Sequence, residues 1–301
     1  MKNFKSLKVL VVLLSFSSIL SCSNDETNEL KETNLNSDFK RKLESFNENY
    51  QSQISQARWG FGGFFNSIVI AAADIAGAGA GALSVSEIAF GIGVCTAGTG
   101  GGVVAGTAAV VSGAGASIAA ANDFSKKKPM KSYSNYIKSL NIDYTKKYSY
   151  LSNIGALHNE QVFNILNEGL DKNKFNCSDK RYIENSNFLS ISRTKKWQNV
   201  ISKVEKISTA YSKHKDVRIL TNSLRNNSLI NDNVKNVLDL FFVIYNQSKN
   251  SRNIEDIANF YIKAVSDEAS LDNTEKEALI SSFSVATESP YFWKNQTETD
   301  I

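Results

Sequence analysis

The sequence predicts an all-α protein in which a glycine-zipper helical hairpin is followed by a helical C-terminal domain. The 301-residue chain has only two prolines, so long stretches can stay helical without interruption. Fifteen of the 17 glycines fall within residues 60–115, which sets this tract apart in composition. The predicted parts are a signal peptide (1–21), a flexible tether (22–38), an amphipathic lead-in helix (39–58), the Gly/Ala-rich hairpin (59–124) and the helical domain (130–301).

The first 21 residues have the layout of a secretory signal. Three lysines precede an uncharged apolar run of 12 residues, 9–20, and Ser21 follows. A basic start, a short apolar run and a small residue are typical of an export signal. The run is too short for a helix that crosses a membrane, which needs about 20 residues.

Residues 19–22, Ile-Leu-Ser-Cys, resemble the lipobox of bacterial lipoproteins. Ile19 and Leu20 depart from the residues most usual there. The resemblance implies cleavage before Cys22 and attachment of fatty acids such as palmitate to this residue. Two or three acyl chains give firm anchoring, so a lipid membrane is the expected partner. The alternative is an ordinary secretory signal with an incidental cysteine.

The tether begins with Ser-Asn-Asp-Glu, residues 23–26. This segment resembles the short acidic signal of surface-exposed lipoproteins in the Bacteroidota, and it implies the cell surface of the outer membrane as the location. The alternative is an acidic start to a plain linker. Residues 27–38 have few apolar groups to bury, which favours a flexible tether.

The lead-in helix is predicted from helical spacing of apolar residues. Phe39, Leu43, Phe46, Tyr50 and Ile54 recur at intervals of three and four, which places them on one face.

The hairpin is predicted from small residues spaced four apart in a tract that carries only two ionised side chains, Asp74 and Glu87. Such stripes let two helix backbones approach closely, within one chain or by self-association of two hairpins. We expect arms near residues 61–83 and 88–122, with residues 84–87 at or near the turn. The predicted packing residues are Ala73, Gly77, Gly81, Gly98, Gly102 and Gly106.

Two environments suit such a hairpin. Arg58 and the lysines at 126–128 flank its ends, which favours insertion into a membrane with anionic headgroups. The aromatic residues at 59–65 suit a membrane interface but also a plug on the C-terminal domain. The alternatives are a hairpin packed inside the protein, a tract that stays disordered, or a helix broken where glycines crowd residues 98–102.

The C-terminal domain is predicted to consist of short amphipathic helices. One covers residues 157–170 and closes at Gly169. The expected boundaries of the others are a start near Asn231, a cap at Asn253 or a neighbour, a capping box of Asp272 with Glu275, and a final helix limited by Pro290.

Catalytic chemistry has one candidate, His158 with Glu160. Residues this close on a helix do not face each other, and no nucleophile motif accompanies them. We expect His158 to form a hydrogen bond at a helix start or between helices, and His214 to lie on the surface. We predict a protein that is not an enzyme, although an enzyme using His158 and Glu160 stays an alternative.

Composition argues against several other classes. The net charge of +4 includes the three signal lysines, so the remainder is close to neutral and gives no sign of a nucleic-acid-binding face. Cys95 and Cys177 lie in very different surroundings, and the chain has two histidines. We expect neither a metal site nor a cofactor.

The chain as a whole loosely resembles a group of surface lipoproteins. Shared features are the lipid signal, the Gly/Ala tract, the Leu-His-Asn segment at 157–159 and the ending at 289–293. The resemblance implies a location and no activity. We expect a non-enzymatic surface lipoprotein whose hairpin interacts with membranes, as an antibacterial or pore-forming agent. The alternative is a surface adhesin or scaffold whose hairpin packs internally.

Overall fold

The computed structural model describes residues 35–55, 62–92, 99–121, 140–169 and 186–297. Within these ranges every regular element is a helix, which confirms the predicted class. They belong to one compact unit, residues 34–301, so the glycine-rich tract shares its core with the helices around it. The elements are α2 (Ser37–Ser55), α3 (Gly62–Gly91), α4 (Thr99–Ala121), η3 (Lys146–Leu151), α5 (Ile154–Glu168), α7 (Ser186–Ser192), α8 (Lys195–His214), α9 (Val217–Asn226), α10 (Asp232–Tyr245), α11 (Ser251–Asp267) and α12 (Asn273–Thr297).

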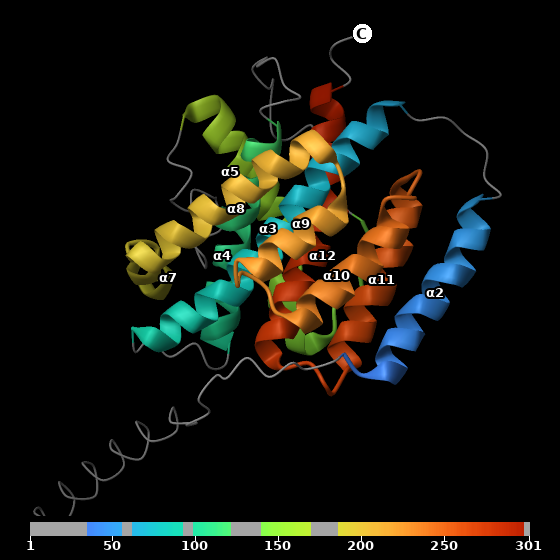
Figure 1. Ribbon diagram of the computed structural model, residues 1–301, viewed down its shortest axis with the longest axis horizontal. Helices are drawn as coiled ribbons and strands as arrows, with labels where there is room; N and C mark the ends of the chain where they lie inside the picture. Colours follow the sequence, from blue (N-terminus) through green and yellow to red (C-terminus); the bar gives the residue numbers. More distant parts are fainter. Residues whose placement is uncertain (1–34, 56–61, 93–98, 122–139, 170–185, 298–301) are drawn as a thin grey trace, which may run out of the picture. The chain divides into compact units, whose positions relative to one another are not determined.

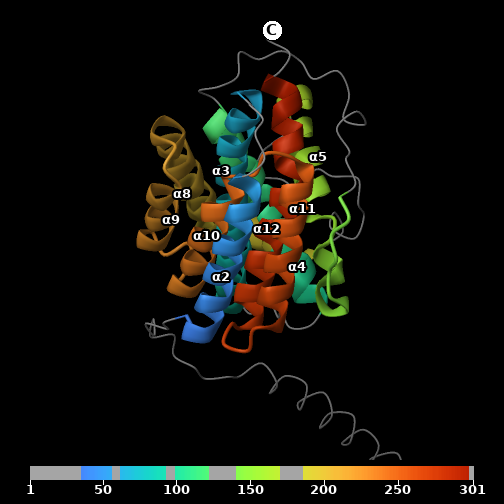
Figure 2. The same ribbon diagram turned by 90° about the vertical axis from the view of Figure 1, so that its right-hand side faces the viewer.

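The two apolar helices α3 and α4 pack against each other as the predicted hairpin, at the centre of this unit (Figure 1). α12 runs along α3 in equally extensive contact, while α5 and α8 cover α4. Figure 2 shows α8 and α9 on one side of α3, and α5, α11 and α12 on the other. The hairpin therefore lies inside a layer of more polar helices.

The turn of the hairpin is not where the sequence suggested. Residues 84–87 are helical, and α3 continues to Gly91. Ser84 and Val85 are buried, and Ile88 follows them into the core. No glycine or proline interrupts this stretch, so burial of its apolar side keeps the helix intact. The first glycine after Gly81 is Gly91, where α3 ends.

The lead-in helix α2 packs on the outer helices α10 and α11. Phe46 stacks on Phe260. The amide of Asn47 donates to the carbonyl of Leu240 at 2.8 Å and accepts from the Tyr261 hydroxyl at 3.0 Å. The amphipathic helix predicted from residue 39 onward is thus confirmed, and it forms part of the outer layer.

Local capping signals explain several helix boundaries. α5 ends at Gly169, whose φ of 64° is the left-handed conformation that glycine adopts without strain. Asn231 caps α10 by accepting from the Val234 N–H. At the start of α12, Asp272 accepts from the Glu275 N–H, and Glu275 accepts from the Asp272 N–H, both at 2.8 Å. This is the predicted capping box.

Two predicted boundaries differ from the structure in detail. The cap of α11 is Asn250, whose side chain accepts from the N–H of Asn253. Pro290 does not limit the last helix but lies inside α12, which continues to Thr297. A proline removes a single helical hydrogen bond, and contacts on both sides of it hold the helix together.

Candidate functional site

The backbones of α3 and α4 approach each other closely at two of the predicted small residues, Gly77 and Gly81. A Cβ atom on Gly77 would be 2.6 Å from the Cβ of Ala116 and 3.1 Å from the carbonyl oxygen of Ser112. A Cβ on Gly81 would overlap the Cβ of Ser112 and lie 2.5 Å from the carbonyl oxygen of Ala108. Only glycine leaves room for this approach, which brings many atoms into dispersion contact.

The surface that α4 offers to this seam is not the predicted one. Opposite Gly77 and Gly81 lie Ala108, Ser112 and Ala116, which are themselves four residues apart. Gly102 instead accommodates the ring of Tyr150, whose hydroxyl donates to Glu277 at 2.6 Å. The four-residue spacing of small residues is therefore correct for α4, but the stripe is displaced.

The remaining predicted packing residues have different outcomes. Ala73 is fully buried in the core around the hairpin. Gly106 is buried within α4. Gly98 lies outside the described residues, as do Cys22, Cys95 and Cys177.

Both arms are long and apolar enough to cross a bilayer. Ser67–Gly91 spans 25 residues and Gly101–Ala121 spans 21, against about 20 needed for a membrane helix. The most apolar windows of these segments are 94% and 89% buried inside the protein. Core helices of soluble proteins meet the same criterion, so length alone establishes only the capacity to span.

A buried polar cluster links the hairpin by hydrogen bonds to the helices that cover it. Asp74, in the middle of α3, is fully buried. Its Oδ2 atom accepts from the Ser289 hydroxyl and, at 3.0 Å, from the indole N–H of Trp293. The same indole N–H lies 3.1 Å from the Ser117 hydroxyl oxygen. One carboxyl thus joins α3 to α12, and the indole extends the cluster to α4.

His158 brings a fourth helix, α5, to this cluster. Its side chain is fully buried, with Nε2 3.8 Å from Oδ2 of Asp74 and Nδ1 3.1 Å from the amide oxygen of Asn159. The ring also limits the space beside Gly113 of α4. Burial raises the pKa of Asp74, although the His158 imidazole and the hydrogen-bond donors around the carboxyl act to lower that pKa.

The cluster contains the residue types of a hydrolytic triad but not its geometry. Ser289 donates to Asp74, whereas a catalytic serine must bond the imidazole that accepts its proton. Ser289, Asp74 and His158 are all 0% exposed, so no substrate reaches them in this state. The arrangement serves to hold helices together.

Sequence reasoning missed this cluster as a site. Asp74 stood out as a charge in an apolar tract, and a buried carboxyl needs hydrogen-bond donors. Nothing local indicated that the donors would be Ser289 and Trp293, more than 200 residues away. His158 does lie between helices, and His214 is exposed, as expected.

A metal site finds no support in the described part of the chain, where no three His, Cys, Asp or Glu residues gather around one point. Comparison of the sequence and fold with protein-family models, curated proteins and solved structures returns no match. The site is therefore interpreted from its own geometry.

Proposed function

We propose that this protein is a lipid-anchored surface protein of the bacterial outer membrane that stores an apolar hairpin under a helical cover and delivers it to a membrane. Acyl chains on Cys22 would hold it at the cell surface. Release of α3 and α4 would permeabilise the target bilayer, an antibacterial or pore-forming activity without enzymatic turnover.

The observation that carries this proposal is the contrast between the apolar hairpin and the more polar helices that cover it. Two adjacent helices of spanning length are largely buried inside the protein, and together they contain only two ionisable side chains, Asp74 and Glu87. Outside its cover the hairpin would expose far more apolar surface than a soluble monomer tolerates. A bilayer is the solvent that suits it.

In this proposal, Asp74 is the residue that holds the hairpin in the covered state. A carboxyl in the middle of a spanning helix is costly in lipid, while in the covered state it is held by Ser289, Trp293 and His158. Once the hairpin is released, the face of α3 with Gly79, which α12 covers, becomes free to pack against another hairpin. Self-association would follow from close backbone approach along this face.

A reversible crosslink between hairpin and cover tests the proposal. A Cβ on Gly79 would lie 2.6 Å from the hydroxyl oxygen of Ser282 on α12, so Gly79→Cys with Ser282→Cys can form a disulfide. The host chain lacks its signal and carries Cys22→Ala, Cys95→Ser and Cys177→Ser. We expect dye release from vesicles by the reduced protein and none by the oxidised protein. The two single-cysteine variants control for the substitutions.

Equal leakage in the oxidised and reduced states would overturn the proposal, because the crosslink prevents the hairpin from leaving α12. Lack of leakage in both states, with the protein remaining in the aqueous phase, would support the second candidate. In that case the protein is a surface scaffold or adhesin whose hairpin is a permanent core. The tight seam at Gly77 and Gly81 and the buried Asp74 cluster favour it.

A further inference from the structure

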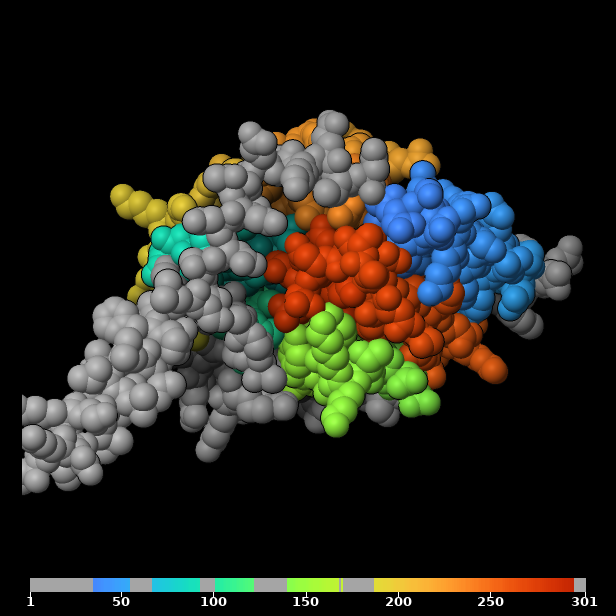
Figure 3. Space-filling view, turned by 90° about the horizontal axis from the view of Figure 1, so that it is seen from below, coloured from blue at the N-terminus to red at the C-terminus, as the bar shows by residue number. Residues whose placement is uncertain are grey.

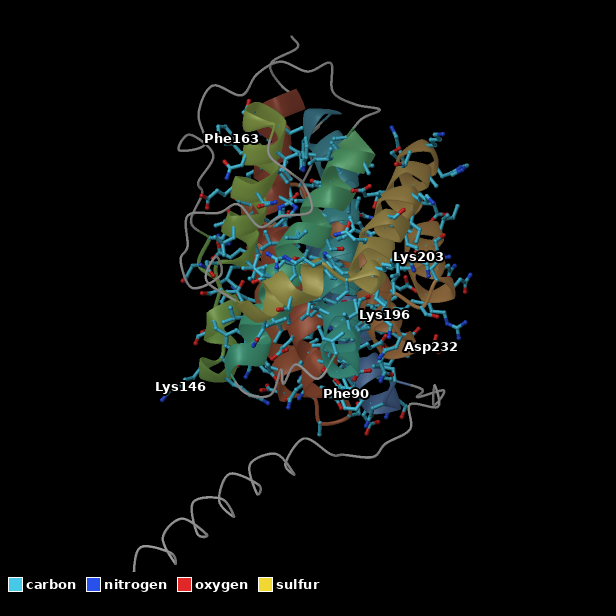
Figure 4. The ribbon with its side chains drawn as sticks, turned by 90° about the vertical axis from the view of Figure 1, so that its left-hand side faces the viewer. Phe90, Lys146, Phe163, Lys196, Lys203 and Asp232 are labelled. Atoms are coloured by element: carbon cyan, nitrogen blue, oxygen red, sulfur yellow. The ribbon has the colours of Figure 1, made fainter. Side chains whose placement is uncertain are left out.

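The hairpin presents an apolar group to solvent at the end of its first arm. Phe90 is 74% exposed, more than any other large apolar side chain in the described residues. Ile92, directly after the last residue of α3, is 42% exposed. Residues 67–85 of α3 are all buried, so Phe90 and Ile92 form a tip where the stored hairpin reaches the surface, and Figure 4 labels Phe90 there.

One basic side chain borders this tip. The ammonium nitrogen of Lys196, on α8, lies 3.5 Å from the place that a Cβ on Gly91 would take. Glu87 is the acid that faces Lys196 here, and the two interact electrostatically. An exposed apolar surface beside a cation is the chemistry that binds a bilayer with anionic headgroups.

The tip lies at the end of the unit where the chain enters it. α2 begins at this end in Figure 1, and Figure 4 places Phe90 there as well. Seen from below, the hairpin in teal is visible at the left and α2 in blue at the right, with the orange-red C-terminal helices between them (Figure 3). Leu35, the first described residue, follows Cys22 by 13 residues, which reach at most about 45 Å when extended.

We infer that the tip formed by Phe90 and Ile92, with Lys196 beside it, is the docking surface for a lipid bilayer. This inference rests on the proposed function and specifies where the membrane is first met. A lipid on Cys22 brings the bilayer within reach of the tip. Phe90 and Ile92 enter the headgroup region, and α3 and α4 lie directly behind them. The hairpin therefore meets the membrane by the end that joins its two arms.

Vesicle flotation of the Cys22→Ala chain without its signal tests the inference. That chain is the parent, and the tip variant carries Phe90→Asp and Ile92→Asp in addition. The control carries Ile219→Asp and Val243→Asp, which replace side chains 43% and 45% exposed on α9 and α10. We expect the tip variant to bind phosphatidylcholine–phosphatidylglycerol vesicles about tenfold more weakly, since charge replaces apolar contact, and the control to bind like the parent. Pure phosphatidylcholine vesicles show how much the cation contributes.

A second readout does not depend on how aspartate affects folding. A polarity-sensitive dye is attached through Phe90→Cys or, as the control, through Val243→Cys, each in a chain with Cys22→Ala, Cys95→Ser and Cys177→Ser. Vesicles should shift the emission of the dye at the tip and leave the control dye unchanged. Equal response of both dyes would overturn the inference.

The outcomes separate the docking surface from the stored hairpin. If the tip variant floats like the parent while the parent still releases vesicle contents, the tip inference fails and the proposed function stands. If flotation depends on the tip but no contents escape in any state, the docking surface stands and hairpin delivery fails. A parent that never floats overturns both. If sedimentation without lipid shows a parent dimer that the tip aspartates dissociate, the occupant is a second copy and the inference fails.

Discussion

The hydroxyl of Tyr245 donates a hydrogen bond of 2.9 Å to the carbonyl oxygen of Ala286. In an uninterrupted helix this carbonyl would accept from the N–H four residues later, but that residue is Pro290. α10 thus supplies the donor that α12 lacks. This bond allows a proline to lie inside the helix that covers the hairpin.

Tyr245→Phe should therefore destabilise the protein by about 1–2 kcal/mol, because it leaves a buried carbonyl without a partner. Pro290→Ala restores the helical N–H, so the same tyrosine substitution should cost less in that background. Chemical denaturation of the four proteins of this double-mutant cycle measures the difference. Additive effects would mean that the tyrosine does not compensate for the proline.

Trp293→Phe should weaken the cluster around Asp74. The substitution removes the indole N–H that bonds the carboxyl, and loss of a buried hydrogen bond costs about 1–2 kcal/mol. Trp197→Phe is the matched control, since Trp197 is equally buried but its indole N–H has no hydrogen-bond partner among the described residues. In urea, Trp293→Phe should have a clearly lower free energy of unfolding than Trp197→Phe. Equal losses would indicate that only ring volume matters.

Gly81→Ala should destabilise the hairpin seam by about 1–3 kcal/mol, because the added methyl group meets backbone and Cβ atoms that cannot move aside. Gly115→Ala on α4 is its control. There the nearest atom, 3.4 Å away, belongs to the flexible end of Glu205. Without a clash, the better helix propensity of alanine should stabilise that variant by roughly 0.5–1 kcal/mol. Thermal unfolding should give a lower melting temperature for Gly81→Ala and a higher one for Gly115→Ala.

Glu288 should make stability fall as pH rises toward neutrality. Burial raises its pKa from 4.5 to about 7, so the folded protein holds a proton that the unfolded chain releases. Its stabilising contribution is complete below pH 4.5 and lost as pH rises to about 7, a change of roughly 3 kcal/mol at most. Glu288→Gln should remove this part of the pH dependence. Chemical denaturation of both proteins between pH 4 and 8 measures the difference.

Local signals in the sequence were enough to find several of the helices and some of their ends. Gly169, Asn231 and the Asp272–Glu275 pair act through atoms a few residues away, so their roles follow from the sequence alone. The turn predicted at residues 84–87 failed because burial outweighs the weak preference of polar residues for a turn. Pro290 was misjudged because its compensating donor comes from a different helix.

The candidate site depends on contacts between distant segments. Spacing identified Gly77 and Gly81 as seam residues, but it could not give the rotation of α4 that turns Gly102 toward Tyr150. Asp74 was visible as a lone charge, whereas its partners come from α4, α5 and α12. Such pairings arise from packing of the whole core, and no local pattern encodes them.

The arrangement of α12 over α3 also sets an order of events for the newly made chain. Among the described helices α12 is the last in sequence, yet it is the main cover of the apolar arm that comes near the start. Until residues 273–297 are available, α3 has no lasting place to bury its surface. Binding by chaperones during that interval, and rapid proteolysis of any chain that stops short of Asn273, follow from this single contact.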